Sequence, residues 1–196
     1  MEPSRARILD AALSLMSEHG VAGTSMRMLA GECGLNVATL YHHFPSKASL
    51  LEAVLAERGY LHRLAEELPP AELQRGDASP ARRLERFVRW LWLASLEEEA
   101  VWRLLVGEAL RGEPAARAAA TTIIEALDPA VESWLGDVVP ELGRRTPAVA
   151  RLVRALLFSL VVEHLALGPD DARARSRVRD LAAAVYTPTP TAEPIA

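Results

Sequence analysis

The most constraining feature of this 196-residue sequence is residues 24–47, which contain two short helical patterns around a glycine. In the first pattern, apolar residues recur at i, i+3, i+4 and i+7, namely Met26, Leu29, Ala30 and Cys33. This spacing predicts a helix with one buried face. Gly34 can end that helix in the left-handed conformation, and Asn36 can cap the next one after a very short connection. Two helices joined so tightly are typical of a helix-turn-helix.

The second helix is expected over Asn36–His43, with Leu40 and Phe44 pointing to the core at i and i+4. This leaves other faces for Val37, Ala38, Thr39, Tyr41 and His42, which are small or able to form hydrogen bonds. Such a face is suited to a DNA major groove, where methyl groups contact thymine and hydroxyl groups contact base edges. We therefore expect Val37, Ala38 and Thr39 to read bases.

Several short motifs stand in a fixed order over the first third of the chain. They are Ile8–Ala12, His19-Gly20, Thr24–Arg27, Leu29-Ala30, Gly34-Leu35, Ala38–Phe44, Ser46-Lys47 and Leu50-Leu51. In this order and spacing they resemble the N-terminal domain of the TetR family of transcriptional repressors. The resemblance implies a homodimeric repressor with an all-helical C-terminal domain, released from a palindromic DNA site by a small ligand.

The resemblance also implies that Tyr41 and Lys47 contact phosphates. The expected DNA-binding residues are then Ser25, Met26, Arg27, Asn36, Val37, Ala38, Thr39, Tyr41, His42, His43 and Lys47. The formal net charge of −4 is opposite to the usual sign for a DNA-binding protein, so the attraction must be local. Lys47 is the only lysine in the sequence, and an accidental solvated lysine remains the alternative.

Helical periodicity continues along the rest of the chain, which predicts an all-α fold. Helices are expected over residues 5–19, 46–68, 80–96, 98–110, 114–139, 147–167 and 170–186, with a kink or break at Pro129. The predicted domains are a DNA-binding domain over 1–48, with its helix-turn-helix at about 25–44, and a ligand-binding and dimerisation domain over 49–186. The proline-containing tail, residues 187–196, is expected to be disordered.

Residues 155–167 are apolar nearly all round a helix, so more than one side needs cover. The helix expected over 170–186 has a single apolar stripe and cannot provide all of that cover. A homodimer formed through both helices would satisfy this need, and a central core helix in a monomer is the alternative. The candidate interface residues are Leu152, Leu156, Leu160, Glu163, Val178, Leu181 and Val185.

Aromatic residues in the central helices suggest a mainly apolar ligand pocket with a few polar groups. This composition favours a small hydrophobic or aromatic ligand. Aromatic residues at helical spacing are also common in plain cores, and an adjacent Glu163-His164 pair can be satisfied within a core or an interface. The candidate ligand-binding residues are Tyr60, Trp90, Trp92, Trp102, Arg103, Glu108, Trp134, Phe158 and His164.

Other classes of function find little support in the sequence. It lacks a paired nucleophile and base, a glycine-rich phosphate loop, and histidines spaced as metal ligands, so we expect neither an enzyme, a cofactor nor a metal site. The single cysteine, Cys33, fits a small buried side chain better than a redox sensor. Without a long apolar run or a cleavable signal, the chain is expected to be soluble and cytoplasmic. A regulator of the same fold without a ligand, or less plausibly a helical enzyme, remains the alternative.

Overall fold

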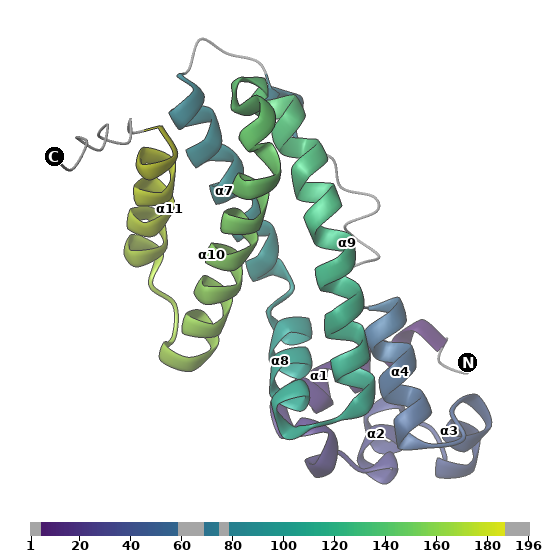
Figure 1. The fold of residues 1–196 in the computed structure, drawn as a ribbon. Coiled ribbons are helices and arrows are strands. Elements are labelled where there is room, and N and C mark those ends of the chain that lie inside the picture. The colour runs from purple at the N-terminus through teal and green to yellow at the C-terminus, as the bar shows by residue number, and fades with distance from the viewer. Residues whose placement is uncertain (1–4, 59–68, 75–78, 187–196) are drawn as a thin grey trace, which may run out of the picture. The chain divides into compact units, whose positions relative to one another are not determined.

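The structure, a computed structural model, describes residues 5–58, 69–74 and 79–186 (Figure 1). Every regular element in these ranges is a helix, so the predicted all-α fold is confirmed for them. The elements are α1 (Arg5–Gly23), α2 (Met26–Cys33), α3 (Val37–His43), α4 (Lys47–Glu57), α6 (Ala71–Gln74), α7 (Pro80–Glu97), α8 (Glu99–Arg111), α9 (Pro114–Val138), η1 (Pro140–Arg145), α10 (Thr146–Leu167) and α11 (Asp171–Tyr186). Residues 59–68 of the helix predicted over 46–68, the candidate Tyr60 and the tail lie outside the described residues.

The chain forms two compact units, each described by itself below. Unit 1 comprises residues 1–68 and 94–129, and unit 2 comprises residues 69–93 and 130–196. The predicted functional boundary between residues 48 and 49 does not coincide with this division. The reason is that α8 and the first part of α9 group with the N-terminal helices. A division of function at residue 48 therefore stays a prediction.

In unit 1, α1 is the central helix and packs against α2, α4 and α8. These helices share one core, formed by Ile8, Leu9, Ala12, Met16, Val21, Met26, Leu29, Ala30, Leu40, Phe44, Leu50, Leu51, Val54 and Leu104. Each large aliphatic side chain buried in this way contributes about 1.5–3 kcal/mol to folding. Because Leu104 comes from α8, that helix is part of the core on which α2 and α3 rest.

The helices α7, α8 and α11 each bury one stripe of side chains, as the helical periodicity of the sequence predicts. On α7, Leu84, Phe87, Val88, Leu91 and Ser95 are buried, and on α8 the buried positions are Val101, Leu104, Leu105 and Glu108. On α11 they are Ala174, Val178, Ala182 and Val185. Within unit 2, α10 packs against α11 and η1. The periodicity thus identified correctly which face of each helix is covered.

Of the two outcomes predicted at Pro129, a kink or a break, the structure excludes the break. The proline lies inside α9, which continues from Pro114 to Val138. An interior proline costs about 3 kcal/mol because it removes one backbone hydrogen bond. On either side of it, buried side chains continue the same stripe, at Ile123, Leu127, Val131, Trp134, Leu135 and Val138. Each of them contributes about 1.5–3 kcal/mol, so their burial outweighs the cost of the proline.

One side of α10 carries apolar side chains that its own unit does not cover. Leu152 is 52% exposed and Phe158 is 57% exposed. Three predicted interface residues, Leu160, Val178 and Val185, are instead buried within the chain. These side chains leave almost no surface for a partner, so the prediction that they lie in the interface is wrong. The remaining candidates, Leu156, Glu163 and Leu181, are half-buried.

None of the described helices is both long and apolar enough to cross a bilayer. In the same described ranges, no cluster of three His, Cys, Asp or Glu side chains is placed to hold a metal ion. Cys33 is half-buried and packs against the core of unit 1.

Candidate nucleic-acid interface

The first helix of the predicted helix-turn-helix has well-defined ends. Ser25 caps α2, where its hydroxyl oxygen accepts a hydrogen bond from the Met28 amide at 3.1 Å. Gly34 ends the helix with a φ of 65°, a conformation that a glycine adopts without steric cost. The next amide, that of Leu35, donates to the Ala30 carbonyl at 2.8 Å. The sequence-based prediction of this turn is confirmed.

The following helices begin at capping residues as well. The side-chain oxygen of Asn36 accepts from the amides of Ala38 at 2.6 Å and Thr39 at 3.3 Å, which fixes the start of α3. At the start of α4, the Ser46 and Ser49 side chains each accept from the other residue's amide, at 3.0 Å and 3.1 Å. α3 is therefore a short helix whose start and following turn are fixed by local hydrogen bonds.

The surface of α3 agrees in part with the predicted reading face. Leu40 and Phe44 are buried, as expected. The exposed positions are Ala38, Tyr41 and His42, while Val37, Thr39 and His43 are half-buried. Val37 also packs against the core of unit 1. The side chains that α3 offers to a groove are therefore mainly Ala38, Tyr41, His42 and part of Thr39.

On α2 one predicted contact is corrected. Met26 is only 8% exposed and belongs to the core, so it offers little surface to DNA. The exposed methionine is Met28, at 43%, which the sequence reading did not select. Its position, two residues after Met26 on a helix, could have shown that it lies on another face. Ser25 and Arg27 are exposed, as a DNA contact requires.

Residues 20–24 join α1 to the reading helices and are held by side-chain contacts. Within α1 the backbone leaves the helical conformation at Gly20, whose φ is 72°, close to the predicted end of the helix. The Lys47 ammonium donates to the carbonyl oxygens of Val21 at 2.7 Å and Thr24 at 3.0 Å. The buried Thr24 hydroxyl lies 2.9 Å from the Gly20 carbonyl. Lys47 thus uses two of its three donors within the protein, which leaves one for a phosphate.

The carboxylate of Glu108, on α8, also contacts this segment. Its Oε1 atom accepts from the Val21 amide at 3.1 Å and from Arg111 at 3.1 Å. Glu108 is 5% exposed. The sequence predicted that Glu108 contacts a ligand. In the structure, its Oε1 atom instead accepts a hydrogen bond from the end of α1. The polar partner that Glu108 needs when buried is therefore a backbone amide.

Arg5 connects the start of α1 with two other helices of unit 1. It forms an ion pair with Glu57 at the end of α4, and its guanidinium lies 5.1 Å from the ring centroid of Phe44. The hydrogen bond from Arg5 lowers the pKa of the Glu57 carboxyl below its usual range. The charge of Arg5 is therefore already paired within the protein.

The candidate ligand-binding residues that the structure describes have different surroundings within each unit. In unit 2, Trp90 and Trp134 meet edge to face with ring centroids 5.8 Å apart, and Phe87 lies 6.0 Å from Trp90. Phe158, by contrast, is exposed on α10. In unit 1, Arg103 is exposed and pairs with Glu99 on the same helix. Arg103 and Phe158 are therefore not part of an apolar pocket in this conformation.

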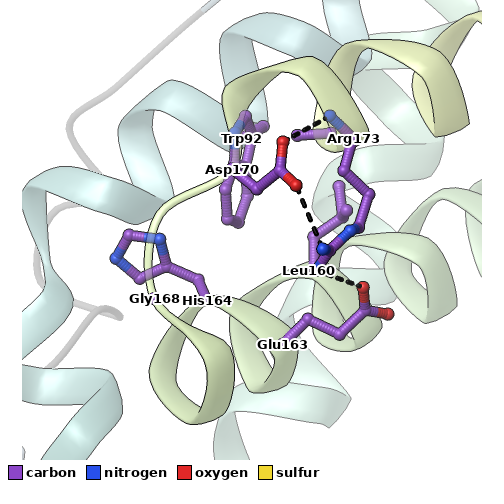
Figure 2. A pocket seen from close by; sticks show the side chains of 8 residues that line it. Trp92, Leu160, Glu163, His164, Gly168, Asp170 and Arg173 are labelled. Carbon is purple, nitrogen blue, oxygen red and sulfur yellow. Dashed lines mark hydrogen bonds and ion pairs between the residues drawn. The ribbon is translucent and has the colours of Figure 1, made fainter.

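Trp92 and His164 do lie together, beside a small cavity in unit 2 (Figure 2). Their rings meet edge to face at 5.9 Å, and Leu160, Glu163, Asp170 and Arg173 also line the space. The cavity offers about 10 Å³ to the centre of a water molecule. This is the room of about one water, so a larger ligand would require side chains or helices to move.

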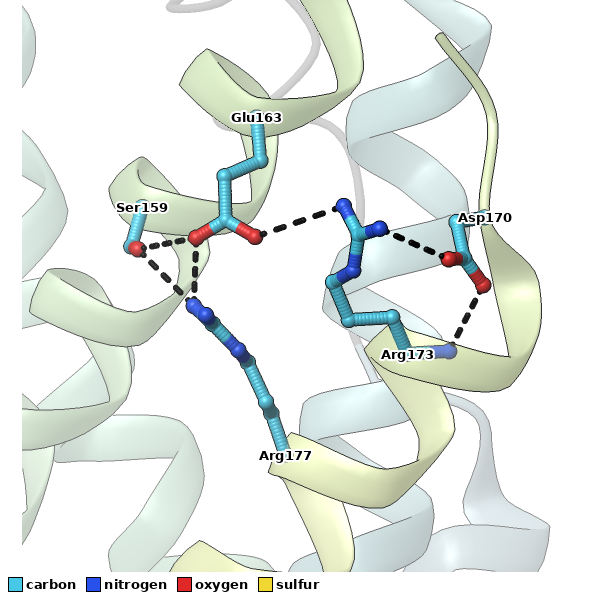
Figure 3. Close-up of polar contacts among 5 residues, drawn as sticks. All are labelled: Ser159, Glu163, Asp170, Arg173 and Arg177. Carbon is cyan, nitrogen blue, oxygen red and sulfur yellow. Dashed lines mark hydrogen bonds and ion pairs between the residues drawn. The ribbon is translucent and has the colours of Figure 1, made fainter. Parts of the chain in front are cut away.

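Glu163 joins α10 to α11 beside this cavity (Figure 3). It accepts from the Ser159 hydroxyl at 2.9 Å and forms an ion pair with Arg177. Arg173 lies 3.9 Å from its other oxygen and 3.0 Å from a carboxylate oxygen of Asp170. The sequence left two roles open for Glu163, a ligand contact or a polar pair within the protein. The structure shows the second, since Glu163 is paired with two arginines of the same chain.

Comparisons with known proteins identify the segment that contains α2 and α3. Residues 8–54, which include all of α2 and α3, match the family model described as "Bacterial regulatory proteins, tetR family". The N-terminal domain belongs to the TetR family. Its curated relatives include the transcriptional regulator UidR of Escherichia coli K12, 41% identical over 56 residues. They also include the transcriptional repressor KstR of Rhodococcus jostii RHA1, 48% identical over 52 residues.

The matched segments cover 29% of this chain and 29% of UidR, and 26% of this chain and 24% of KstR. They are therefore confined to the TetR-family domain. The names of these relatives are those of transcriptional regulators and repressors rather than enzymes.

Solved structures extend the likeness in fold over nearly the whole chain. A transcriptional regulator from Rhodococcus sp. RHA1 has a TM-score of 0.68 at 19% identity, covering 93% of this chain and 96% of its own. GusR of Salmonella enterica has a TM-score of 0.63 at 20% identity, covering 92% of this chain and 94% of its own. At such identities the likeness concerns the fold alone. The helices after α4 therefore have the architecture of these regulators.

Proposed function

We propose that this chain is a DNA-binding transcriptional repressor that recognises a palindromic operator as a homodimer and leaves it when a small hydrophobic ligand binds. The observation that carries the proposal is the pair α2 and α3 in a TetR-family domain, with α3 capped by Asn36 and exposing Ala38, Tyr41 and His42. A short helix that is fixed at its start can place such side chains in a major groove.

Phosphate contacts would supply the affinity. Arg27 is exposed in the first turn of α2, and one donor of Lys47 remains available at the start of α4. A helix N-terminus attracts anions because its first amides have no partner within the helix. These local groups support DNA binding despite the net charge of −4.

A homodimer would cover the apolar side of α10. Leu152 and Phe158 are more than half exposed, and Ala155 on the same helix is also exposed. Exposed apolar side chains grouped on one helix are typical of a surface that binds a partner. A two-fold dimer would also present two copies of α3, as a palindromic DNA site requires.

Ligand release has less direct support. The Phe87, Trp90 and Trp134 rings are apolar groups of the kind that line pockets for aromatic ligands. The cavity beside Trp92 has room for about one water, so it would not hold such a ligand in this conformation. A regulator of the same fold that has no ligand is the second candidate. Binding can lower DNA affinity only if the ligand prefers a conformation that DNA does not bind.

The test is a gel-shift titration with duplex DNA from the region upstream of the gene and a scrambled duplex of the same composition. We expect tighter binding to the upstream duplex, and loss of that preference when Thr39→Ala is used. Equal affinity for the two duplexes would refute the proposed function. Repeating the titration with lipophilic compounds, while tryptophan fluorescence is followed, distinguishes the two candidates. Compounds that change fluorescence and weaken DNA binding support ligand release, whereas unchanged DNA affinity supports the second candidate.

A further inference from the structure

The Val21 backbone is held by two helices other than its own. Its amide donates to Glu108 on α8 at 3.1 Å, and its carbonyl oxygen accepts from Lys47 on α4 at 2.7 Å. The carbonyl oxygen of Thr24, the last residue before the Ser25 cap, also accepts a hydrogen bond from Lys47, at 3.0 Å. The segment leading into α2 is therefore fixed by a carboxylate from one helix and an ammonium from another.

Two glycines make room for the Glu108 carboxylate and its partner. A Cβ atom at Gly20 would lie 3.3 Å from Glu108 Oε1, and the φ of 72° there strongly favours glycine. A Cβ atom at Gly107 would lie 3.1 Å from an Arg111 nitrogen. Both contacts are tight, so the absence of side chains allows the Glu108 and Arg111 pair to lie close to the α1 backbone.

Burying the Glu108 carboxylate costs free energy, which its contacts must offset. A carboxylate with a side chain only 7% exposed loses most of its hydration, and its hydrogen bonds must replace that hydration. Neighbouring buried positions on α8, such as Leu104 and Leu105, are apolar. A polar residue in this stripe that accepts from a backbone amide points to a requirement for a fixed geometry rather than for stability alone.

We propose that Glu108 is a positioning residue for DNA reading. By accepting from Val21 it fixes residues 20–24, and through them the orientation of α2 and α3 on the core of unit 1. A shift of α8 would break this hydrogen bond and lower DNA affinity, even though Glu108 itself does not touch DNA. This inference rests on the proposed function for its DNA readout, but the position of Val21 can be measured without DNA.

The test compares three variants of the full chain. Glu108→Ala removes the acceptor. Glu108→Gln replaces the carboxylate by an amide on a side chain of the same length, so an oxygen remains that can accept from Val21. Glu99→Ala is the matched control. Glu99 is also a glutamate of α8 paired with an arginine of the same helix, Arg103. Circular dichroism and thermal unfolding establish that each variant folds. The readouts are hydrogen exchange of the Val21 amide by NMR and affinity for the upstream duplex over a range of salt concentrations.

We expect Glu108→Ala to speed exchange of the Val21 amide and to weaken DNA binding by about tenfold, with an unchanged salt slope, because one hydrogen bond to a charged group is lost. Glu108→Gln should recover most of both properties, and Glu99→Ala should behave as the wild type. Unchanged exchange at Val21, or faster exchange with unchanged DNA affinity, would overturn the inference. If Glu108→Ala does not fold, Glu108→Leu replaces it, because leucine removes the acceptor but fills the buried position with an apolar side chain, and the same two outcomes decide. Failure of the wild type to prefer the upstream duplex refutes the proposed function instead, and Val21 exchange alone then decides whether Glu108 fixes the segment.

Discussion

The indole rings of Trp90 and Trp134 meet edge to face with their centroids 5.8 Å apart, which joins α7 to the second half of α9. Trp134 is 7% exposed, so most of its ring area is removed from water. Edge-to-face contacts between aromatic rings add to the free energy gained from burial.

Replacing Trp134 by alanine should therefore destabilise the protein by about 3–5 kcal/mol, because it leaves a cavity and removes the ring contact. Chemical denaturation followed by circular dichroism measures this change. Ile124→Ala, on the same helix at a 49% exposed position, is the control and should change stability by less than about 1 kcal/mol. Equal effects of the two substitutions would contradict the described burial of Trp134.

Substitutions on α3 should change which DNA sequences are preferred. Ala38→Arg and Thr39→Ala alter an exposed and a half-buried side chain of this helix, so a change in the ranking of operator variants is expected. Competition gel shifts with a set of single-base operator variants measure the ranking. Ala118→Arg, which adds the same charge at an exposed position of α9, should leave the ranking as it is. If Ala38→Arg and Thr39→Ala also retain the wild-type ranking, α3 is not the reading helix.

Lys47→Ala should weaken binding to all duplexes about equally. If the third N–H donor of Lys47 contacts a phosphate in the wild type, the variant's slope of log affinity against log salt should be flatter by about one unit. The hydrogen bonds to Val21 and Thr24 add a second effect, since their loss loosens the segment before α2. Filter-binding titrations at several salt concentrations separate the two effects. Lower affinity with an unchanged slope would limit Lys47 to the hydrogen bonds within the protein.

The dimer proposal predicts different outcomes for exposed and buried positions of α10. Phe158→Glu places a charge on the exposed apolar side and should give a folded monomer in sedimentation velocity at micromolar concentration. Leu160→Glu places a charge at a position that is 3% exposed, so it should unfold the chain. Leu110→Glu, at an 82% exposed position of α8, should remain dimeric. A wild-type chain that is monomeric under these conditions would exclude the proposed dimer.

Cys33 should react slowly with alkylating reagents near neutral pH. Burial raises the pKa of its thiol, so the reactive thiolate is a smaller fraction than in a free cysteine, and that fraction grows as pH rises. Mass spectrometry after timed iodoacetamide treatment measures the rate, with reduced glutathione as reference and the urea-unfolded protein as a positive control. Alkylation as fast as that of glutathione would favour the redox-sensor alternative.

Local sequence patterns were sufficient for the helices and their caps. The roles of Gly34, Asn36 and the stripe on α8 depend on residues within one or two turns, so spacing predicts them. The hydrogen bond between Glu108 and Val21 joins residues 87 positions apart, and periodicity carries no information about such a partner. In the same way, the apolar character of α10 did not show that Leu160 is buried within the chain while Phe158 is exposed.

The single lysine gives this protein a chemical handle at the segment between α1 and α2. Besides the α-amino group, Lys47 is the only primary amine of the chain, and its nitrogen is hydrogen-bonded to Val21 and Thr24. Acylation would convert this ammonium into an amide with a single N–H group, so it would remove at least one of the two hydrogen bonds. A reagent that labels amines would thus modify a single side chain of the sequence, at the junction between α1 and α2, without an engineered residue.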